Sequence, residues 1–139
     1  MVVDTSVVLD ALVGSDPASR SLRKRLRGAK ELHAPHLIDV ELLHVLRRLS
    51  TAGEISVDRA QDAIGDLADL RLQRYPHHPM ADRIWELRSH LTAYDAAFVA
   101  LAELLGMTLL TRDGPLAAAP GVRCEVELID SDSAHPARP

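Results

Sequence analysis

Short apolar runs alternate along this chain with longer amphipathic segments, and two of the apolar runs lead toward an aspartate. Residues 1–3 precede Asp4, and residues 108–111 end two positions before Asp113. Residues 5–13, after the first run, carry apolar side chains at the spacing of a helix. Strands that alternate with helices are typical of a parallel sheet covered by helices on both faces. The order of elements therefore predicts an α/β fold with three layers and a mainly parallel central sheet.

Turn and capping residues divide the rest of the chain into further elements. Asp16 followed by Pro17 is typical of a helix start, and Gly53 and Gly106 are typical of helix ends. We expect strands over residues 1–4, 31–34, 72–75, 108–111 and 122–129. We expect helices over residues 5–13, 17–27, 36–51, 56–72, 80–88 and 92–105, and a short one after Asp113. Residues 1–130 then form one domain, and the polar residues 131–139 form a disordered tail.

The composition argues against several other classes of protein. With the single cysteine Cys124, the chain forms neither an internal disulfide nor a cysteine zinc site. Aromatic residues make up 3% of the chain, so aliphatic side chains build the core and clustered aromatic platforms for bases are not expected. Glu103 and Gly106 interrupt the longest apolar stretch, residues 96–110, which is too short to span a membrane. A strand-like run begins at Met1 without a basic segment before it, so we expect no signal peptide and a cytoplasmic protein.

Basic residues gather in one short segment, although the formal net charge is −4. A local cluster can hold phosphate even on an acidic protein, because counterion release depends on local charge. A solvated helix face is the alternative interpretation. Arg112 is a further candidate for phosphate contact, with a surface salt bridge as its alternative. The candidates within the cluster are Arg20, Arg23, Lys24 and Arg27.

Two aspartates follow predicted interior strands. Asp4 and Asp113 stand at the carboxyl ends of such strands. Ligands of parallel sheets bind at this edge, near the point where the strand order reverses. Each aspartate could instead cap the helix that follows it, as aspartates often do in strand-to-helix turns.

Two further carboxylates lie on apolar faces of predicted helices. Glu41 shares a helix face with Ile38 and Val45, and burying it is costly unless another group pairs with it. His44 or a nearby arginine could supply that partner. Asp95 lies three residues after Thr92, which resembles a capping box, and it also faces inward.

A bound cation would explain all four carboxylates together. Carboxylates that converge at one edge of a sheet repel one another and raise one another's pKa values. A divalent cation removes that cost, and ligands that are all oxygen favour Mg²⁺ or Mn²⁺ over zinc. The sequence therefore predicts a Mg²⁺ or Mn²⁺ site at the carboxyl edge of the sheet.

Four segments of the sequence, in order, resemble the motifs of the PIN-domain nucleases, and in length and motifs the chain looks like a VapC-type toxin of a toxin–antitoxin module. The segments are VVDTSVVL at residues 2–9, APHLIDVELLHVL at 34–46, LTAYDAAFVALAE at 91–103 and LLTRDGPL at 109–116. The resemblance extends from Met1 to about Ile129. It implies a PIN fold and a metal-dependent endoribonuclease whose acidic quartet is Asp4, Glu41, Asp95 and Asp113. Thr111 matches a hydroxyl position that supports the acidic cluster in this family, and Ser6 is a second candidate for such support.

The resemblance also implies partners. VapC-type proteins typically cut RNA, often transfer RNA, form homodimers and are inhibited by a VapB antitoxin. The basic cluster and Arg112 are then candidates for RNA contact, and the apolar helices within residues 36–72 are candidates for antitoxin contact. The apolar sets of these helices are Leu37, Ile38, Val40, Leu42, Val45, Leu46 and Leu49, followed by Val57, Ala60, Ile64, Leu67 and Ala68.

Other functions fit the sequence less well. A haloacid-dehalogenase-type phosphotransferase needs a second aspartate two residues after the first, where this chain has Ser6. A receiver domain needs a late lysine, whereas the lysines here are Lys24 and Lys30. A non-catalytic binding module that keeps the PIN fold is the remaining alternative, and the intact set of four acids argues against it.

Overall fold

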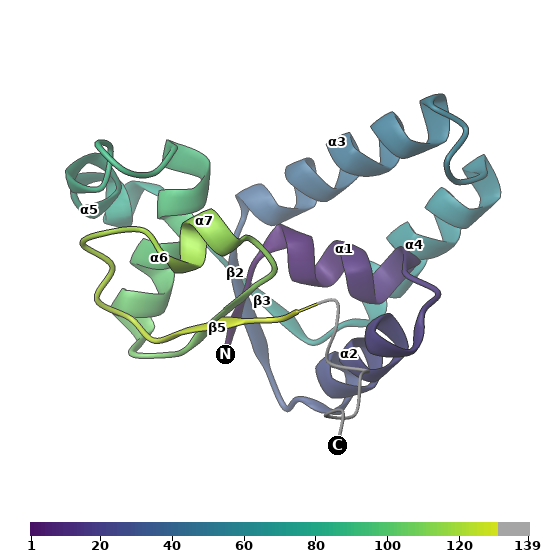
Figure 1. Ribbon diagram of the computed structural model, residues 1–139, viewed down its shortest axis with the longest axis horizontal. Coiled ribbons are helices and arrows are strands. Elements are labelled where there is room, and N and C mark those ends of the chain that lie inside the picture. The colour runs from purple at the N-terminus through teal and green to yellow at the C-terminus, as the bar shows by residue number, and fades with distance from the viewer. Residues whose placement is uncertain (131–139) are drawn as a thin grey trace, which may run out of the picture.

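A five-stranded parallel sheet forms the centre of the computed structural model, which describes residues 1–130 (Figure 1). The strands lie in the order β3-β2-β1-β4-β5, and every pairing is parallel. Their bounds are β1 Val2–Val3, β2 Leu32–Pro35, β3 Leu72–Tyr75, β4 Leu109–Thr111 and β5 Val126–Leu128. The expected tail, residues 131–139, lies outside the described residues.

Helices cover both faces of the sheet, which confirms the predicted three-layer α/β fold. On one face α6 contacts β1, β2 and β4, and α5 packs against α6. On the other face α1 contacts β4 and is itself packed against α2, α3 and α4, as Figure 1 shows. The helices are α1 Thr5–Val13, α2 Pro17–Gly28, α3 Leu37–Thr51, α4 Val57–Asp69, the 3₁₀ turn η1 His78–Met80, α5 Ala81–Glu86, α6 Ala93–Leu105 and α7 Gly114–Ala117.

Local side chains set the ends of several helices where the sequence predicts them. The Asp16 carboxylate accepts the backbone N–H of Ser19 at 2.8 Å, with Pro17 in the first helical position. The Ser56 hydroxyl likewise accepts the N–H of Arg59 at 3.0 Å. Gly106 ends α6 in the left-handed conformation, with φ of 63°, which glycine adopts without steric cost.

Aliphatic side chains fill the interior, as the low aromatic content predicts. Val2 and Val3 are completely buried between the two helical layers, so this very short strand presents an apolar side chain to each face of the sheet. Phe98 on α6 is the largest fully buried side chain among the described residues. The central position of β1 fixes where the chain leaves the sheet at Asp4.

Three expectations about element length and burial are wrong. The helix expected over residues 56–72 ends at Asp69, because the chain becomes extended at Leu70 to enter β3. The strand expected over residues 122–129 pairs only along Val126–Leu128, because its partner β4 has three residues. Val40 and Val57, which the pattern places on apolar faces, are 69% and 65% exposed.

No helix within residues 1–130 combines the length and the apolar character needed to cross a membrane.

Candidate active site

Asp4 lies at the carboxyl end of β1 and is the residue from which α1 begins. Its side chain is buried, with an exposed fraction of 6%. One carboxylate oxygen accepts the N–H of Thr5 at 2.8 Å, so the predicted capping role is present. The other oxygen accepts the hydroxyls of Thr111 at 2.7 Å and Ser6 at 2.9 Å. Burial raises the pKa of Asp4, these three hydrogen bonds lower it in part, and the charge of Asp113 raises it further.

Thr111 and Ser6 connect Asp4 to the turn that follows β4. The Thr111 hydroxyl accepts the N–H of Asp113 at 3.0 Å, and the Ser6 hydroxyl accepts the N–H of Arg112 at 3.0 Å. Each hydroxyl therefore donates to Asp4 and accepts a backbone N–H from the turn after β4. The two bridges hold the ends of β1 and β4 in a fixed relation, so Asp4 and Asp113 share one edge of the sheet.

Asp113 begins α7 and accepts the N–H of Leu116 at 3.1 Å. Asp113 therefore makes the helix-capping contact that the sequence predicts as the alternative to ligand binding. The negative charge of Asp113 raises the pKa of both Asp4 and Asp95, which shows that its carboxylate faces the same space. Capping and ligand binding are compatible, because a carboxylate has lone pairs on both oxygens.

Glu41 reaches this space from α3, and its partner differs from the one expected. The hydroxyl of Thr5 donates to Glu41 Oε1 at 2.8 Å, whereas within residues 1–130 neither His44 nor an arginine makes a hydrogen bond or ion pair with its carboxylate. Burial raises the pKa of Glu41, the Thr5 hydrogen bond lowers it, and the charges of Asp4 and Asp95 raise it further. Sequence spacing carries no signal for this contact, because Thr5 and Glu41 are 36 positions apart.

Asp95 enters from the first turn of α6. The Thr92 hydroxyl accepts the backbone N–H of Asp95 at 3.2 Å, which confirms the predicted helix start. Burial raises the pKa of Asp95, and the charges of Asp4 and Asp113 raise it further, while the Thr92 hydroxyl lowers it. Asp95 is therefore a carboxylate that burial and like charges both disfavour.

The four carboxylates come from four different elements and meet in one electrostatic neighbourhood. Asp4 and Asp113 follow the adjacent strands β1 and β4, while Glu41 and Asp95 lie on helices of opposite layers. Three of the four have raised pKa values, and each of those three is raised by the charge of another member. Such a cluster of perturbed acids in one place is a physical sign of a functional site.

The carboxylates are not drawn into a tight ligand cage. Within residues 1–130, no three Asp, Glu, His or Cys side chains stand close enough together to hold one metal ion. The donor set itself is all carboxylate oxygen, which fits a hard divalent cation.

The basic candidates do not gather around the carboxylates as a group. Arg112 lies beside the site, and its guanidinium pairs with Asp10 at 2.5 Å. The guanidinium of Arg23 donates to the carbonyls of Ala11 and Gly14 at the end of α1, and Arg20 donates to the carbonyl of Ser15. These side chains hold the turn between α1 and α2. The remaining two candidates, Lys24 and Arg27, are exposed on α2, where Arg27 lies 3.7 Å from Asp66.

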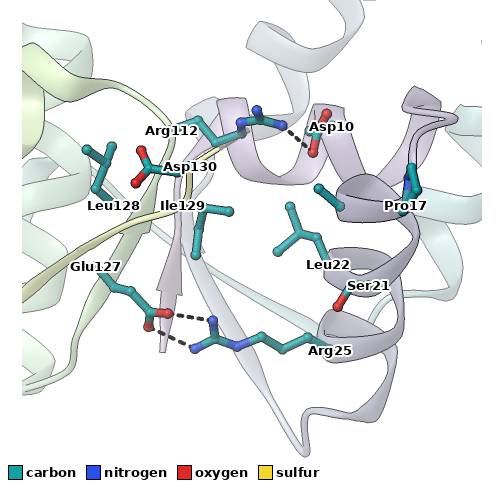
Figure 2. A pocket seen from close by; sticks show the side chains of 11 residues that line it. Asp10, Pro17, Ser21, Leu22, Arg25, Arg112, Glu127, Leu128, Ile129 and Asp130 are labelled. Carbon is teal, nitrogen blue, oxygen red and sulfur yellow. Dashed lines mark hydrogen bonds and ion pairs between the residues drawn. The ribbon is translucent and has the colours of Figure 1, made fainter. Parts of the chain in front are cut away.

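Figure 2 shows a hollow beside the basic helix α2. The hollow has a volume of about 360 Å³ and lies between α2 and the end of β5. On one side Arg112 points to Asp10, and on the other Arg25 makes two hydrogen bonds with Glu127, at 2.7 and 2.8 Å. Both guanidinium groups lining the hollow therefore face a carboxylate of the same chain.

Comparison with known proteins places this chain among its relatives. The family model described as PIN domain matches residues 1–122. Ribonuclease VapC1 of Mycobacterium tuberculosis is 45% identical over 129 residues, covering 92% of this chain and 96% of that protein. Ribonuclease VapC9 of the same organism is 36% identical over 129 residues, with 93% and 98% covered. The chain therefore belongs to the PIN-domain family and, within it, to the VapC toxins.

Solved structures share the fold. A protein from Pyrobaculum aerophilum superposes with a TM-score of 0.68 at 20% identity, covering 90% of this chain and 81% of that one. A chain from a toxin–antitoxin complex of Klebsiella pneumoniae superposes with a TM-score of 0.66 at 18% identity, covering 93% and 97%. The VapBC2 structure from Rickettsia felis gives a TM-score of 0.66 at 14% identity, covering 93% and 98%. These similarities establish the fold over nearly the whole described chain.

Proposed function

We propose that this chain is a metal-dependent endoribonuclease that hydrolyses phosphodiester bonds and acts as the toxin of a toxin–antitoxin pair. The observation that carries the proposal is the convergence of Asp4, Glu41, Asp95 and Asp113, three of them with raised pKa values. Membership of the VapC family supports it, since the relatives described above are named ribonucleases.

The carboxylates supply the ligands for Mg²⁺ or Mn²⁺ in this proposal. Asp4, Asp95 and Asp113 would hold the ion, and Glu41 would complete the shell directly or through water. An ion held there would neutralise charge on a phosphate and lower the pKa of a water molecule. Relief of the mutual repulsion between the carboxylates would favour binding of the ion.

Asp4 is the fixed member of the set. Its oxygens accept hydrogen bonds from Thr5, Ser6 and Thr111, so its position is defined before any ligand arrives. Thr111 and Ser6 act in support of the acids, because they hold Asp4 and also the backbone at Asp113. Fixed carboxylates lower the cost of ordering the site when substrate binds.

RNA is the substrate class that we propose, with structured RNA such as transfer RNA as the first candidate, cut in the cytoplasm. Arg112 is the best placed of the basic candidates, because it follows β4 at the edge that carries Asp4 and Asp113. Lys24 and Arg27 on α2 provide a second, more distant contact for the RNA backbone. Arg20 and Arg23 contribute positive charge while they hold the backbone carbonyls of residues 11–15.

Two exposed apolar surfaces fit the partners that the family implies. An apolar patch of Leu37, Val40 and Tyr94 joins α3 to the start of α6, and its Val40 and Tyr94 are 69% and 63% exposed. The exposed Leu43 extends this patch along α3, one turn after Val40. We propose that a second copy of the chain covers this patch in a homodimer, since a patch on a symmetry axis meets its own copy.

The second surface is a pair of apolar side chains on α4. Val57 and Ile64 lie two turns apart on one face of that helix and are 65% and 41% exposed. We propose that a VapB-type antitoxin covers this pair. The toxin–antitoxin complexes among the solved structures of this fold support a partner of that kind.

Cleavage of transfer RNA by the purified chain tests the nuclease. We expect discrete fragments with Mg²⁺ or Mn²⁺, none with EDTA, and a loss of at least roughly 100-fold in rate for Asp95→Asn, because substituting groups behind metal ligands already costs 10- to 100-fold. Gel analysis of the fragments measures this. Fragments that persist in EDTA, or full activity in folded Asp95→Asn, would remove the metal-dependent assignment.

A non-catalytic binding module with the same fold is the alternative. It predicts RNA binding without cleavage, and Asp95→Asn would leave that binding unchanged. The raised pKa values count against it, because four neighbouring carboxylates destabilise a fold that has no use for them.

A further inference from the structure

Thr5 contacts two of the four carboxylates at once. It is the first residue of α1, directly after Asp4, and its backbone N–H donates to Asp4 Oδ1 at 2.8 Å. Its hydroxyl donates to Glu41 Oε1, also at 2.8 Å. This one residue therefore links the end of β1 to the carboxylate on α3.

The hydroxyl is the sole partner of the Glu41 carboxylate among the described residues. Neither another hydrogen bond nor an ion pair reaches the Glu41 oxygens in residues 1–130. Glu41 stands on α3, which meets α1 as a neighbouring helix, and a glutamate side chain has three rotatable bonds. Without the Thr5 hydroxyl, no hydrogen bond within residues 1–130 would hold the Glu41 carboxylate, and its side chain could turn toward solvent.

Thr5 is suited to hold a carboxylate in place. Its side chain is β-branched, so steric contact with the backbone restricts its χ1 torsion. Its backbone is fixed by the start of α1 and by the bond to Asp4. The position of the hydroxyl therefore depends on the same structure that positions Asp4.

We propose that Thr5 is a positioning residue that holds Glu41 toward Asp4 and Asp95, where Glu41 can take part in binding the cation directly or through water. The inference rests on the proposed metal-dependent nuclease and adds a residue that is not one of the four acids. Thr5 acts through Glu41 and does not itself bind the ion or the substrate.

A purely structural role for Thr5 makes different predictions. If the bond only ties α1 to α3, its loss lowers thermal stability and leaves ion affinity and cleavage per folded molecule unchanged. If the bond positions Glu41, its loss weakens ion binding and cleavage. Both effects then disappear when Glu41 itself has been replaced.

The experiment compares Thr5→Val, Thr5→Ser and Thr108→Val in the full chain, with circular dichroism to confirm folding. Thr108→Val is a matched control, because the Thr108 hydroxyl also donates to a glutamate, Glu125, at 3.3 Å. This pair does not include any of the four acids. The readouts are Mn²⁺ affinity by titration calorimetry and the rate of transfer RNA cleavage. We expect Thr5→Val to lose roughly 10-fold or more in both, as for other groups that orient metal ligands. Thr5→Ser, which keeps the hydroxyl, should recover most of the loss, and Thr108→Val should match the unsubstituted chain.

A double-substitution cycle completes the test, with Thr5→Ala used in place of Thr5→Val if the valine variant does not fold. We expect Thr5→Val combined with Glu41→Gln to bind Mn²⁺ no more weakly than Glu41→Gln alone. Equal Mn²⁺ affinity of Thr5→Val and the unsubstituted chain would overturn the role of Thr5, as would a further loss in the Glu41→Gln background. If the unsubstituted chain neither binds Mn²⁺ nor cuts RNA, the proposed nuclease fails first and this inference fails with it.

Discussion

Burial raises the pKa of Asp95, and the negative charges of Asp4 and Asp113 raise it further. At the residue scale this means that the folded state holds the Asp95 proton more tightly than the unfolded state does. The ionised carboxylate therefore costs stability when no cation is present, and the cost grows as pH rises through the raised pKa. A residue required for the proposed chemistry is thus a residue that weakens the metal-free fold.

Asp95→Asn should raise the thermal stability of the metal-free chain at neutral pH, because it removes a half-buried charge near the charges of Asp4 and Asp113. The gain should shrink as pH falls toward the range in which Asp95 itself is protonated. Differential scanning calorimetry in EDTA across pH 5 to 8 measures this, and added Mn²⁺ should raise the Tm of the unsubstituted chain more than that of the variant. A variant that is less stable than the parent at every pH would contradict the electrostatic explanation.

Asp4 differs from Asp95 in this respect. Its oxygens accept three hydrogen bonds that favour the ionised form and offset part of the burial. Replacing it by asparagine would set an amide N–H group against hydroxyl donors. Ionised Asp4 therefore destabilises the fold less than its burial alone would. Asp95 is the better position for testing the effect of charge on stability, because its replacement disturbs fewer hydrogen bonds.

At the scale of elements, side chains from α2 and α4 hold the end of α1 and the turn that follows it. The end of α1 is held by Arg23, and Arg59 from α4 donates to the carbonyl of Leu12 at 2.8 Å. Gly14 closes the helix against Ser19, whose hydroxyl bonds Asp10 at 2.9 Å. Positive charge near the carboxyl end of a helix is also favourable to its dipole.

Gly14→Ala should destabilise the chain by about 1–3 kcal/mol, because the added Cβ would overlap Ser19 and lie 2.6 Å from the carbonyl oxygen of Asp10. Gly65→Ala is the matched control within α4, where an added Cβ meets no atom within 4 Å. The control should gain about 0.5–1 kcal/mol from helix propensity. Urea denaturation of both variants measures the difference, and equal stabilities would show that the turn is more adaptable than its packing indicates.

At the scale of the whole molecule, the two apolar surfaces lie on different helices, and the first of them borders the acidic edge at Glu41. Leu37, Val40 and Tyr94 of the first surface line one hollow with Glu41, while Val57 and Ile64 lie on α4. Separate surfaces allow self-association and antitoxin binding to be changed one at a time.

A crossed pair of variants tests the two surfaces. Val40→Lys with Leu43→Lys should convert a dimer to a monomer in sedimentation analysis and leave co-purification with an antitoxin intact. Val57→Lys with Ile64→Lys should do the reverse, because a charge within an apolar contact must be desolvated. Leu104→Lys, on an exposed position of α6, is a control for surface charge in general. A chain that is monomeric without substitution would remove the proposed homodimer.

The sequence by itself determined the order of the elements and the identity of the candidate acids. Helix starts at Asp16, Ser56 and Thr92 follow from capping side chains that lie within four residues of the groups they bind. The alternation of strands and helices predicted the three-layer fold, since helices must cover both faces of a parallel sheet. Local rules were sufficient there, because the groups involved are close together in the chain.

Only the tertiary structure decided which groups face each other. The contact of Thr5 with Glu41, the bridges from Thr111 and Ser6 to the neighbouring strand end, and the pairing of Arg112 with Asp10 join residues far apart in sequence. The exposure of Val40 likewise depends on where α3 extends past its neighbours, and its apolar character predicted burial. Periodicity along one helix gives the direction of a side chain, but the atoms that it meets depend on how separate elements pack.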